Sequence, residues 1–330
     1  MIPWHVDLID YKPKLSLCIS AYNEECNIRD CINSILSSDG FAAHEILLLN
    51  NGSKDKTESI MREFSAIGNI KIISFQINTT LQYARNYLLE KSVGEFAVFL
   101  DADGRIAKNY IDILLKNISN DFSIYSGPVI EQATKTNLMY ELHYKSLIES
   151  DSNFLIGANF TINRKKALKV GGFPNITRSR GDESPLIEIM KRAGCKQKFI
   201  DDLIASNHFI NNSYDFLRSA FFEGQNAFLC IKYFKQPLLL KLLYKSMLLT
   251  GTILLVLGLI LSLAKLIFIG IILIALKLFK NKFYWKSVIK NFFSYIFNGS
   301  LLVLPLIYFH TIFHEVGFLI SAIVRAKPNT

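Results

Sequence analysis

The sequence predicts an α/β domain with a mostly parallel sheet, followed by an α-helical membrane region. In the first 240 residues, short runs of aliphatic and β-branched residues alternate with amphipathic segments. Such alternation is typical of parallel strands connected by helices. The remainder of the chain is almost continuously apolar. We therefore predict two domains, at residues 1–240 and 241–330.

Four runs in the first domain have the length and composition of strands. They are Leu15–Ser20, Glu45–Leu49, Ile70–Phe75 and Phe96–Leu100. Between the first two runs, apolar residues recur at helical spacing from Cys26 to Leu36. Ser53 precedes a second helical segment, residues 54–64, and is predicted to be its N-cap.

The net charge of +9 lies in the apolar region. Residues 241–330 contain ten Lys and Arg residues and one acidic residue, Glu315, which leaves 27 basic and 27 acidic residues in the first domain. A domain without excess positive charge is a poor candidate for nucleic-acid binding. Basic residues beside apolar helices suit the anionic cytoplasmic face of a membrane.

The second domain is predicted to contain about three apolar membrane helices, at about 246–263, 265–279 and 299–324. Segment 280–297 interleaves lysines with aromatic residues, as in a helix that lies in the membrane interface. We expect a multi-pass membrane protein that contacts membrane lipids and has a cytoplasmic first domain. A buried hairpin of a soluble protein is the alternative, but the first apolar zone has no polar face.

The remaining histidines and cysteines favour packing over chemistry. His310 and His314 share one face of the last apolar helix, where helix packing is favoured over contact with a lipid phosphate. The five cysteines form no CxxC pair and no metal-ligand spacing, and no signal-peptide pattern precedes the first strand. These features favour a reduced, cytoplasmic first domain.

Asp101, Ala102 and Asp103 directly follow the fourth predicted strand. Carboxylates at this end of a parallel strand face the crevice in which open α/β sheets bind ligands. Their oxygens suit Mn or Mg bridging a diphosphate. Taken alone, the motif is equally compatible with an ordinary Asp-rich turn.

Further segments, in the same order along the chain, resemble the family 2 glycosyltransferases. They are Leu17–Glu25 (LCISAYNEE), Leu48–Thr57 (LLNNGSKDKT), Ala84–Asn86 (ARN), Gly94–Gly104 (GEFAVFLDADG), Gly157–Phe173 (GANFTINRKKALKVGGF) and Gly181–Gly194 (GDESPLIEIMKRAG). The resemblance covers roughly residues 14–208. It implies a GT-A fold, which is Rossmann-like, and inverting sugar transfer from a nucleoside-diphosphate sugar with Mn or Mg.

The resemblance also implies roles for individual residues. Donor-binding roles fall on Ser20, Ala21, Tyr22, Glu24, Asn51, Arg85, Asp101 and Ala102. Metal-binding roles fall on Asp103 and, as a weaker candidate, His208, and acceptor-side roles fall on Gly157 and Asn159. Asn51 stands where many members have a uracil-reading Asp, and because an amide both donates and accepts, the base stays open. The Arg85 guanidinium matches phosphate oxygens, with a solvated helix face as the alternative.

Asp182 and Glu183 occupy the place of the general base that deprotonates the acceptor. Members of the family mostly have Glu followed by Asp here, whereas this chain has the reverse order. Either residue could therefore be the base, and Asp182 is slightly favoured by its residue type. The alternative for the pair is to cap the following helix and stabilise its dipole.

The expected activity is the transfer of one sugar to a membrane-proximal or lipid-linked glycan acceptor. No QxxRW motif follows His208, which argues against a processive synthase, and common kinase, hydrolase and metalloprotease motifs are absent. One alternative is transfer to a polyprenyl phosphate, an anionic acceptor that needs no base. Another is a catalytically weak membrane scaffold in glycan assembly, which the unusual Asn51 and the reversed acidic pair would suit.

Overall fold

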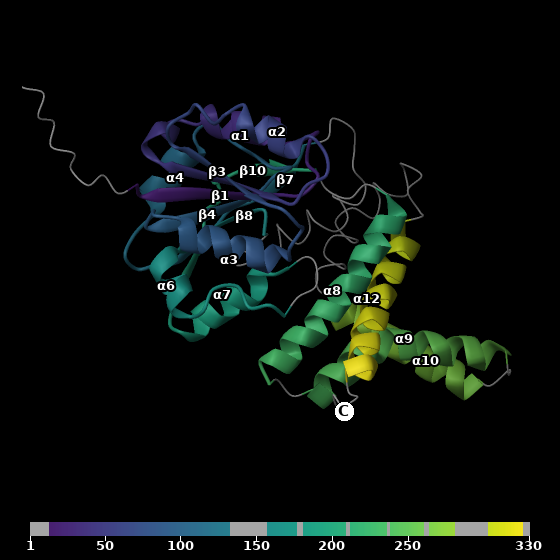
Figure 1. Cartoon of the computed structure of the whole chain (residues 1–330). Coiled ribbons are helices and arrows are strands. Elements are labelled where there is room, and N and C mark those ends of the chain that lie inside the picture. Colours follow the sequence, from purple (N-terminus) through teal and green to yellow (C-terminus); the bar gives the residue numbers. More distant parts are fainter. Residues whose placement is uncertain are drawn as a thin grey trace, which may run out of the picture. The chain divides into compact units, whose positions relative to one another are not determined.

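The computed structural model describes residues 13–132, 157–176, 181–208, 212–235, 238–260, 264–280 and 303–325 (Figure 1). The chain divides into two compact units. The sheet unit comprises residues 1–130, 155–174 and 183–207, and the helical unit comprises residues 131–154, 175–182 and 208–330. The domain boundary predicted near residue 240 stays a prediction.

The main sheet has seven strands among the described residues, in the order β3-β2-β1-β4-β8-β6-β9. Their bounds are β1 Leu15–Ala21, β2 Glu45–Asn51, β3 Ile70–Phe75, β4 Phe96–Asp101, β6 Ile124–Ser126, β8 Asn159–Asn163 and β9 Gln197–Phe199. The strands β1 to β4 are mutually parallel, and β8 runs antiparallel to β4. The predicted α/β class with a parallel-rich sheet is thus confirmed.

All four predicted strands are present, and three of them extend slightly further than predicted. As a result, Asn51 is the last residue of β2 and Asp101 is the last residue of β4. A smaller sheet has the order β5-β10-β7. Its strands are β5 Arg105–Ile106, β10 Ala205–Asn207 and β7 Val129–Glu131.

Helices cover both faces of the main sheet (Figure 1). One face carries α1 Ile28–Leu36, α2 Thr57–Arg62 and α4 Tyr110–Asn117, and the other carries α3 Leu81–Lys91, α6 Arg164–Lys169 and α7 Glu183–Arg192. Within β1, Leu17 and Ile19 pack into the first layer while Cys18 packs into the second. This double burial explains why the strands are apolar along their whole length.

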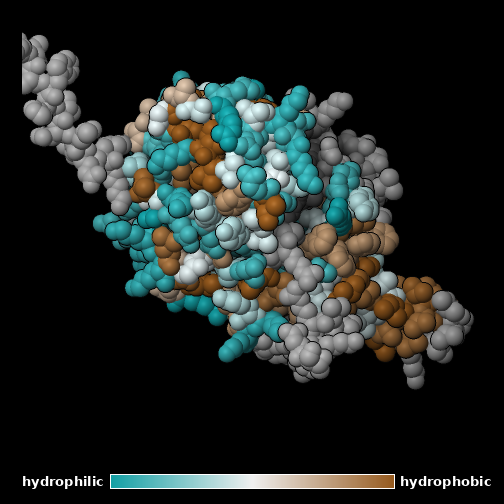
Figure 2. Space-filling model, in the orientation of Figure 1, coloured by the Kyte–Doolittle hydropathy of each residue, from teal (hydrophilic) through white to brown (hydrophobic). Residues whose placement is uncertain are grey.

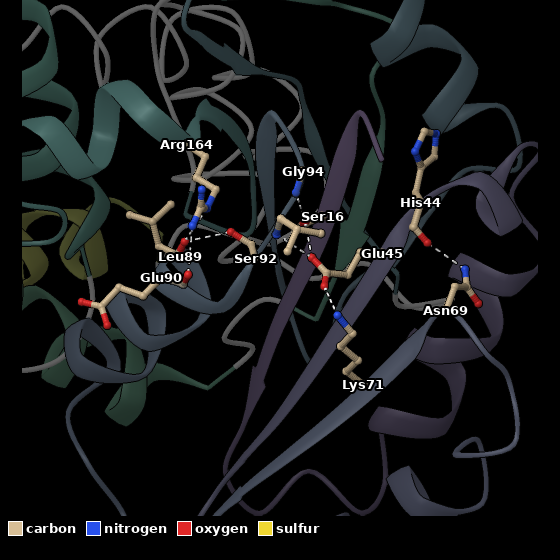
Figure 3. A network of polar contacts seen from close by, with 11 residues as sticks. Ser16, His44, Glu45, Asn69, Lys71, Leu89, Glu90, Ser92, Gly94 and Arg164 are labelled. Carbon is tan, nitrogen blue, oxygen red and sulfur yellow. Dashed lines mark hydrogen bonds and ion pairs between the residues drawn. The ribbon is translucent and has the colours of Figure 1, made fainter. Parts of the chain in front are cut away.

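A polar network closes the amino-terminal edge of the sheet (Figure 3). The buried Glu45 carboxylate accepts hydrogen bonds from Ser16 Oγ (2.6 Å), Lys71 Nζ (2.8 Å) and the Val93 amide (2.9 Å). Ser16 Oγ in turn accepts the Gly94 amide at 2.9 Å. The α3–β4 connection is therefore fixed to β1, β2 and β3 at this edge.

The predicted N-cap role of Ser53 is wrong. Helix α2 begins at Thr57, whose amide is accepted by Asp55 Oδ1 at 3.0 Å. Ser53 Oγ instead accepts the Asn23 amide (3.0 Å), and Asn23 Oδ1 accepts the Lys54 amide (2.9 Å). The loops after β1 and β2 are thereby joined at the carboxyl edge of the sheet.

The helical unit contains α8 Ser213–Tyr233, α9 Leu238–Ile260, α10 Ala264–Lys280 and α12 Val303–Arg325. The backbones of α8 and α12 approach closely at two glycines. A Cβ atom on Gly224 would lie 1.8 Å from the His314 carbonyl oxygen, and one on Gly317 would lie 1.9 Å from that of Phe221. Beside them, Phe228 and Phe318 pack edge to face at 5.5 Å.

Polar groups are also buried within the helical unit. Glu315 on α12 accepts the Leu249 amide of α9 at 2.7 Å, although Leu249 lies inside a helix. His310 is buried and packs against the Phe216 ring at 4.3 Å. Gly251 and Gly270 allow close packing of α9 on α10. His310 therefore has a packing contact of the kind expected from the sequence.

The three described apolar helices fall close to the ranges predicted for membrane helices. Within the described part of the chain, however, no helix combines the length and the apolarity needed to cross a membrane. The predicted spans are therefore unconfirmed, and the predicted interfacial helix 280–297 lies outside the described residues. Figure 2 shows hydrophobic residues gathered on the surface of α9 and α10, where Ile253, Leu259, Phe268 and Ile271 are each at least half exposed.

Candidate functional site

The predicted donor-binding residues meet at the carboxyl edge of the sheet. In the sheet register Ser20 lies beside Asp101, and Ala21 lies beside Asn50, the neighbour of Asn51. The strand order reverses between β1 and β4, because β2 and β3 extend the sheet on one side and β4 begins the other. Such a switch point is where open α/β sheets form their ligand crevice.

Three carboxylates influence one another at this edge. Asp103 lies in a tight turn that is closed by a 2.9 Å hydrogen bond from the Gly104 amide to the Asp101 carbonyl. Burial raises the pKa of Asp103 to about 7, and the negative charges of Asp101 and Glu24 add to this shift. The pKa of Glu24 is raised by burial in the same way, with Asp101 again contributing. Neutralising part of the negative charge of these three carboxylates is therefore favourable.

A divalent cation would offset this repulsion, and carboxylate oxygens are suitable ligands for Mn or Mg. Within the described residues, we assign only the Asp101 and Asp103 side chains as candidate ligands of such a cation. Among the described residues, no group of three or more His, Cys, Asp or Glu side chains is arranged to hold a metal ion. The metal-binding role of Asp103 thus stays a prediction.

Arg85 of α3 is buried beside the carboxylates. Its Nη2 donates to Asp101 Oδ1 and to the Gly157 carbonyl, both at 3.1 Å. Its Nη1 lies 3.8 Å from Glu183 Oε2. Only 4% of the residue is exposed, so the alternative of a solvated Arg on a helix face is wrong.

Three aromatic rings form the floor beneath the Arg85 guanidinium. Its Cζ lies 5.9 Å from the ring centre of Phe99, 5.5 Å from that of Phe160 and 5.9 Å from that of Phe173. Asn86, the next residue of α3, accepts the Phe173 amide (2.7 Å) and donates to the Phe173 carbonyl (2.8 Å). Asn86 therefore fixes part of the floor. Sequence reasoning missed this role, although the ARN segment contained the residue.

Glu183 and Gly157 lie together beside Arg85. Glu183 is the first residue of α7 and is buried, with its charge at the positive end of the helix. A Cβ atom on Gly157 would lie 2.7 Å from Glu183 Oε2, so glycine leaves room for the carboxylate. Asp182 directly precedes α7, is also buried and belongs to the helical unit.

Asn51 is held by Thr79 on both sides of its amide. Its Oδ1 accepts the Thr79 amide (3.0 Å) and hydroxyl (2.7 Å), and its Nδ2 donates to the Thr79 carbonyl (3.0 Å). The adjacent Gly52 has φ +72°, and a Cβ there would lie 2.3 Å from the Ile77 carbonyl carbon. The end of β2 therefore fixes the loop that leads into α3. Thr79 carried no sequence signal for this role.

The remaining predicted residues differ in their surroundings. Asn159 is fully buried, accepts from Tyr110 Oη (2.6 Å) and donates to the carbonyls of Pro128 (3.1 Å) and Leu203 (2.8 Å), so we assign it a positioning role. His208 Nδ1 lies 3.8 Å from Glu131 Oε1, within the helical unit. Ala21 and Ala102 are buried, Ser20 and Glu24 are partly exposed, and Tyr22 is exposed.

Asn207, the residue before His208, contacts the acidic turn. It is the last residue of β10 and is buried, and its side chain hydrogen-bonds Asp103, which opposes the upward shift of the Asp103 pKa. The resemblance pointed to the adjacent histidine, because a late histidine can contact the metal or diphosphate in GT-A enzymes. The short strand pairing of β10 with β5, which begins just after the acidic turn, could not be read from the sequence.

The parallel-rich sheet and its flanking helices form a GT-A-like fold. Residues 16–178 match the family model "Glycosyl transferase family 2". This part of the chain is therefore similar to the family 2 glycosyltransferases. Mannosyltransferase PcManGT from Pyrobaculum calidifontis, in complex with GDP-Man and Mn2+, has the same fold, with a TM-score of 0.61. It is 15% identical, and the match covers 96% of this chain and 89% of that one.

Curated relatives match the same part of the chain. Glycosyltransferase AglE from Haloferax volcanii is 29% identical over 180 residues, which are 52% of this chain and 59% of AglE. Poly-beta-1,6-N-acetyl-D-glucosamine synthase from Staphylococcus epidermidis is 26% identical over 171 residues, which are 48% of this chain and 41% of the synthase. The chain thus spans about three fifths or less of the length of these two relatives.

Proposed function

We propose that the protein is an inverting, metal-dependent glycosyltransferase. It transfers one sugar from a nucleoside-diphosphate sugar to a membrane-proximal or lipid-linked acceptor in the synthesis of a cell-envelope glycan. The observation that carries the proposal is the acidic cluster of Asp101, Asp103 and Glu24 at the β1/β4 switch point, inside a family 2 domain. The comparison with a polysaccharide synthase supports the glycan class.

The donor would occupy the crevice at the ends of β1, β2 and β4. Ser20, Tyr22 and Glu24 border it after β1, and Asn51 holds the loop beside it. Asp103, with Asp101, is the best candidate to hold Mn or Mg, which when bound would offset the charge on the leaving diphosphate. The raised pKa of Asp103 supports this role, because a cation relieves the same repulsion.

The acceptor would be deprotonated by the carboxylate at position 182 or 183. The site geometry favours Glu183, whose carboxylate lies between Gly157 and Arg85 and is linked through Arg85 to Asp101. Asp182 retains the residue type that the family resemblance favours. A positioned general base contributes on the order of 10² to 10⁴ in rate.

A donor screen tests the proposed function. Full-length protein in detergent should bind one nucleoside-diphosphate sugar in calorimetry with Mn, and Asp103→Ala should abolish that binding without unfolding the protein. Asp121→Ala is the matched control, because Asp121 is exposed and precedes β6 at the opposite edge of the sheet. Donor binding that does not depend on Mn, or wild-type turnover by Asp103→Ala, would show that the mechanism does not use the metal.

The acidic pair separates two acceptor classes. With a hydroxyl acceptor, either Asp182→Asn or Glu183→Gln should lower turnover on the order of 10²-fold or more, while donor affinity survives. A polyprenyl phosphate is already an anion, so both variants would then stay within a few-fold of wild type. A scaffold would show no metal-dependent donor binding at all.

We also propose that the C-terminal region anchors the enzyme in a membrane with the catalytic domain in the cytoplasm. The large exposed apolar residues of α9, α10 and α12 support membrane association, since a soluble monomer rarely exposes such patches. The excess of basic residues after residue 240 supports contact with an anionic cytoplasmic leaflet. His208, outside the acidic cluster, is not required by this proposal.

A further inference from the structure

Arg85 connects the two acidic parts of the proposed active site. One guanidinium nitrogen, Nη2, contacts Asp101 on the donor side, and the other, Nη1, faces Glu183 on the acceptor side. The Gly157 carbonyl accepts a second bond from Nη2, and Gly157 is also the residue against which the Glu183 carboxylate packs. The rigid Arg85 guanidinium thus lies in contact with Asp101, the Gly157 carbonyl and Glu183.

The surroundings make this link strong. A guanidinium stays charged at any physiological pH, and its planar fork fixes the directions of its bonds. The aromatic floor of Phe99, Phe160 and Phe173 excludes water from one side of it. Attraction between opposite charges increases as the local dielectric falls, so the carboxylates are held more firmly here than at a solvated surface.

We propose that Arg85 is a positioning residue that holds the Glu183 carboxylate in register with Asp101, so that acceptor activation and donor binding are aligned. The proposal rests on the proposed function. It gives Arg85 a different task from the diphosphate contact expected from the sequence. Because the task depends on bridging two groups with fixed geometry, a lysine at position 85 keeps the charge but loses the bridge.

A double-mutant cycle on turnover tests the proposal. Arg85→Lys should lower kcat about 10- to 100-fold, since small misplacement of a reacting group has effects of this size, while donor affinity changes less than about threefold. In a Glu183→Gln background, the same substitution should lower kcat by no more than about threefold, because residues that act as a unit are non-additive. Multiplicative losses in the double variant would overturn the proposal.

Arg164→Lys provides the matched control. Arg164 on α6 also ties backbone carbonyls together, donating to Leu89 and Glu90 at 3.0 Å each, but lies at the amino-terminal edge of the sheet (Figure 3). This variant should be less stable yet keep its kcat. If Arg164→Lys loses kcat as Arg85→Lys does, the effect of Arg85 is general destabilisation and the proposal fails.

An unfolding cycle needs no substrate and separates this proposal from the proposed function. The shifts in urea midpoint caused by Arg85→Met and Glu183→Gln should not add, because both remove the same contact. Additive shifts would show that the two groups do not interact, and the proposal would fall. If the shifts are coupled but the protein transfers no sugar, the proposed function is contradicted, whereas the contact between Arg85 and Glu183 is supported.

Discussion

Asp103 shows how a single residue couples electrostatics to stability. Its pKa is raised to about 7 from an ordinary value of 3.8, so the folded protein binds a proton that the unfolded chain releases between these values. Stability is therefore highest below the unfolded pKa and is lost as pH rises through the folded pKa. Glu24 shifts in the same direction.

In chelator, the unfolding midpoint of the wild type should fall between pH 5 and pH 8 relative to that of Asp103→Asn, which has no carboxyl to ionise. Thermal unfolding followed across this range measures the difference. Addition of Mn at pH 8 should reverse the loss in the wild type only, because ligand binding to the folded state stabilises it. Parallel pH profiles for the two proteins would contradict the shifted pKa.

The hydrogen bonds of Asn51 offer a reason why this chain has an asparagine where many members of the family have an aspartate. An aspartate could still accept from the Thr79 amide and hydroxyl, but it could not donate to the Thr79 carbonyl. Asn51→Asp should therefore lower the free energy of unfolding by about 1–3 kcal/mol, since the partly buried Thr79 carbonyl loses its donor. Urea denaturation measures this loss.

Thr79→Val is the control for that measurement. It removes the hydroxyl bond to Asn51 but keeps both backbone bonds, so its cost should be smaller, about 0.5–1.5 kcal/mol. An Asn51→Asp protein as stable as the wild type would mean that the amide donor is not needed, and the residue would then be free to read the nucleobase.

At the residue scale, the sequence predicted where a residue lies better than which groups it contacts. Asp101 could be placed because it follows an apolar run that ends at one edge of a parallel sheet, whereas Asn51 was placed by the family resemblance. Asn159 was expected on the acceptor side, yet its amide turns inward to three groups that are distant in sequence. Asn86 and Asn207 were missed for the same reason, because their roles depend on tertiary contacts.

At the element scale, burial on both sheet faces made the strands easy to predict. Helix starts were harder, because local capping competes with tertiary hydrogen bonds. Ser53 has the side chain of an N-cap, but it accepts the Asn23 amide across the loops and the helix begins four residues later. These bonded loops border the proposed donor crevice.

The Glu45 network gives a testable contribution of one element to the fold. Glu45→Ala should lower the free energy of unfolding by about 2–4 kcal/mol, because the buried Ser16 hydroxyl and the partly buried Val93 amide both lose their acceptor. Urea denaturation compares it with Glu95→Ala, which breaks the half-exposed Lys14–Glu95 pair. That control should cost less than about 1 kcal/mol. Equal losses would show that the network adds nothing beyond a surface ion pair.

At the scale of the whole molecule, charge and hydropathy separate along the chain. The first 240 residues carry no net charge and contain the proposed catalytic residues, whereas the basic excess lies in the apolar remainder of the chain. A buried acid, Glu315, and close glycine contacts hold those helices together, while their large apolar side chains remain outside. This arrangement is compatible with the proposed transfer to an acceptor at a lipid surface.

The proposed membrane association leads to a final prediction. The wild-type protein should stay with the membrane fraction after a high-salt wash, because apolar burial, unlike attraction to charged lipids, is not screened by salt. A Phe268→Lys, Ile272→Lys double variant places two charges on the exposed face of α10 and should be partly released. Tyr214→Lys on α8, another exposed aromatic position, should be retained like the wild type.

The orientation of the catalytic domain has its own test. In sealed vesicles, protease should cleave the sheet unit only from the cytoplasmic side. Cleavage from the opposite side, or complete release of the wild type by salt, would contradict a cytoplasmic catalytic domain anchored by these helices.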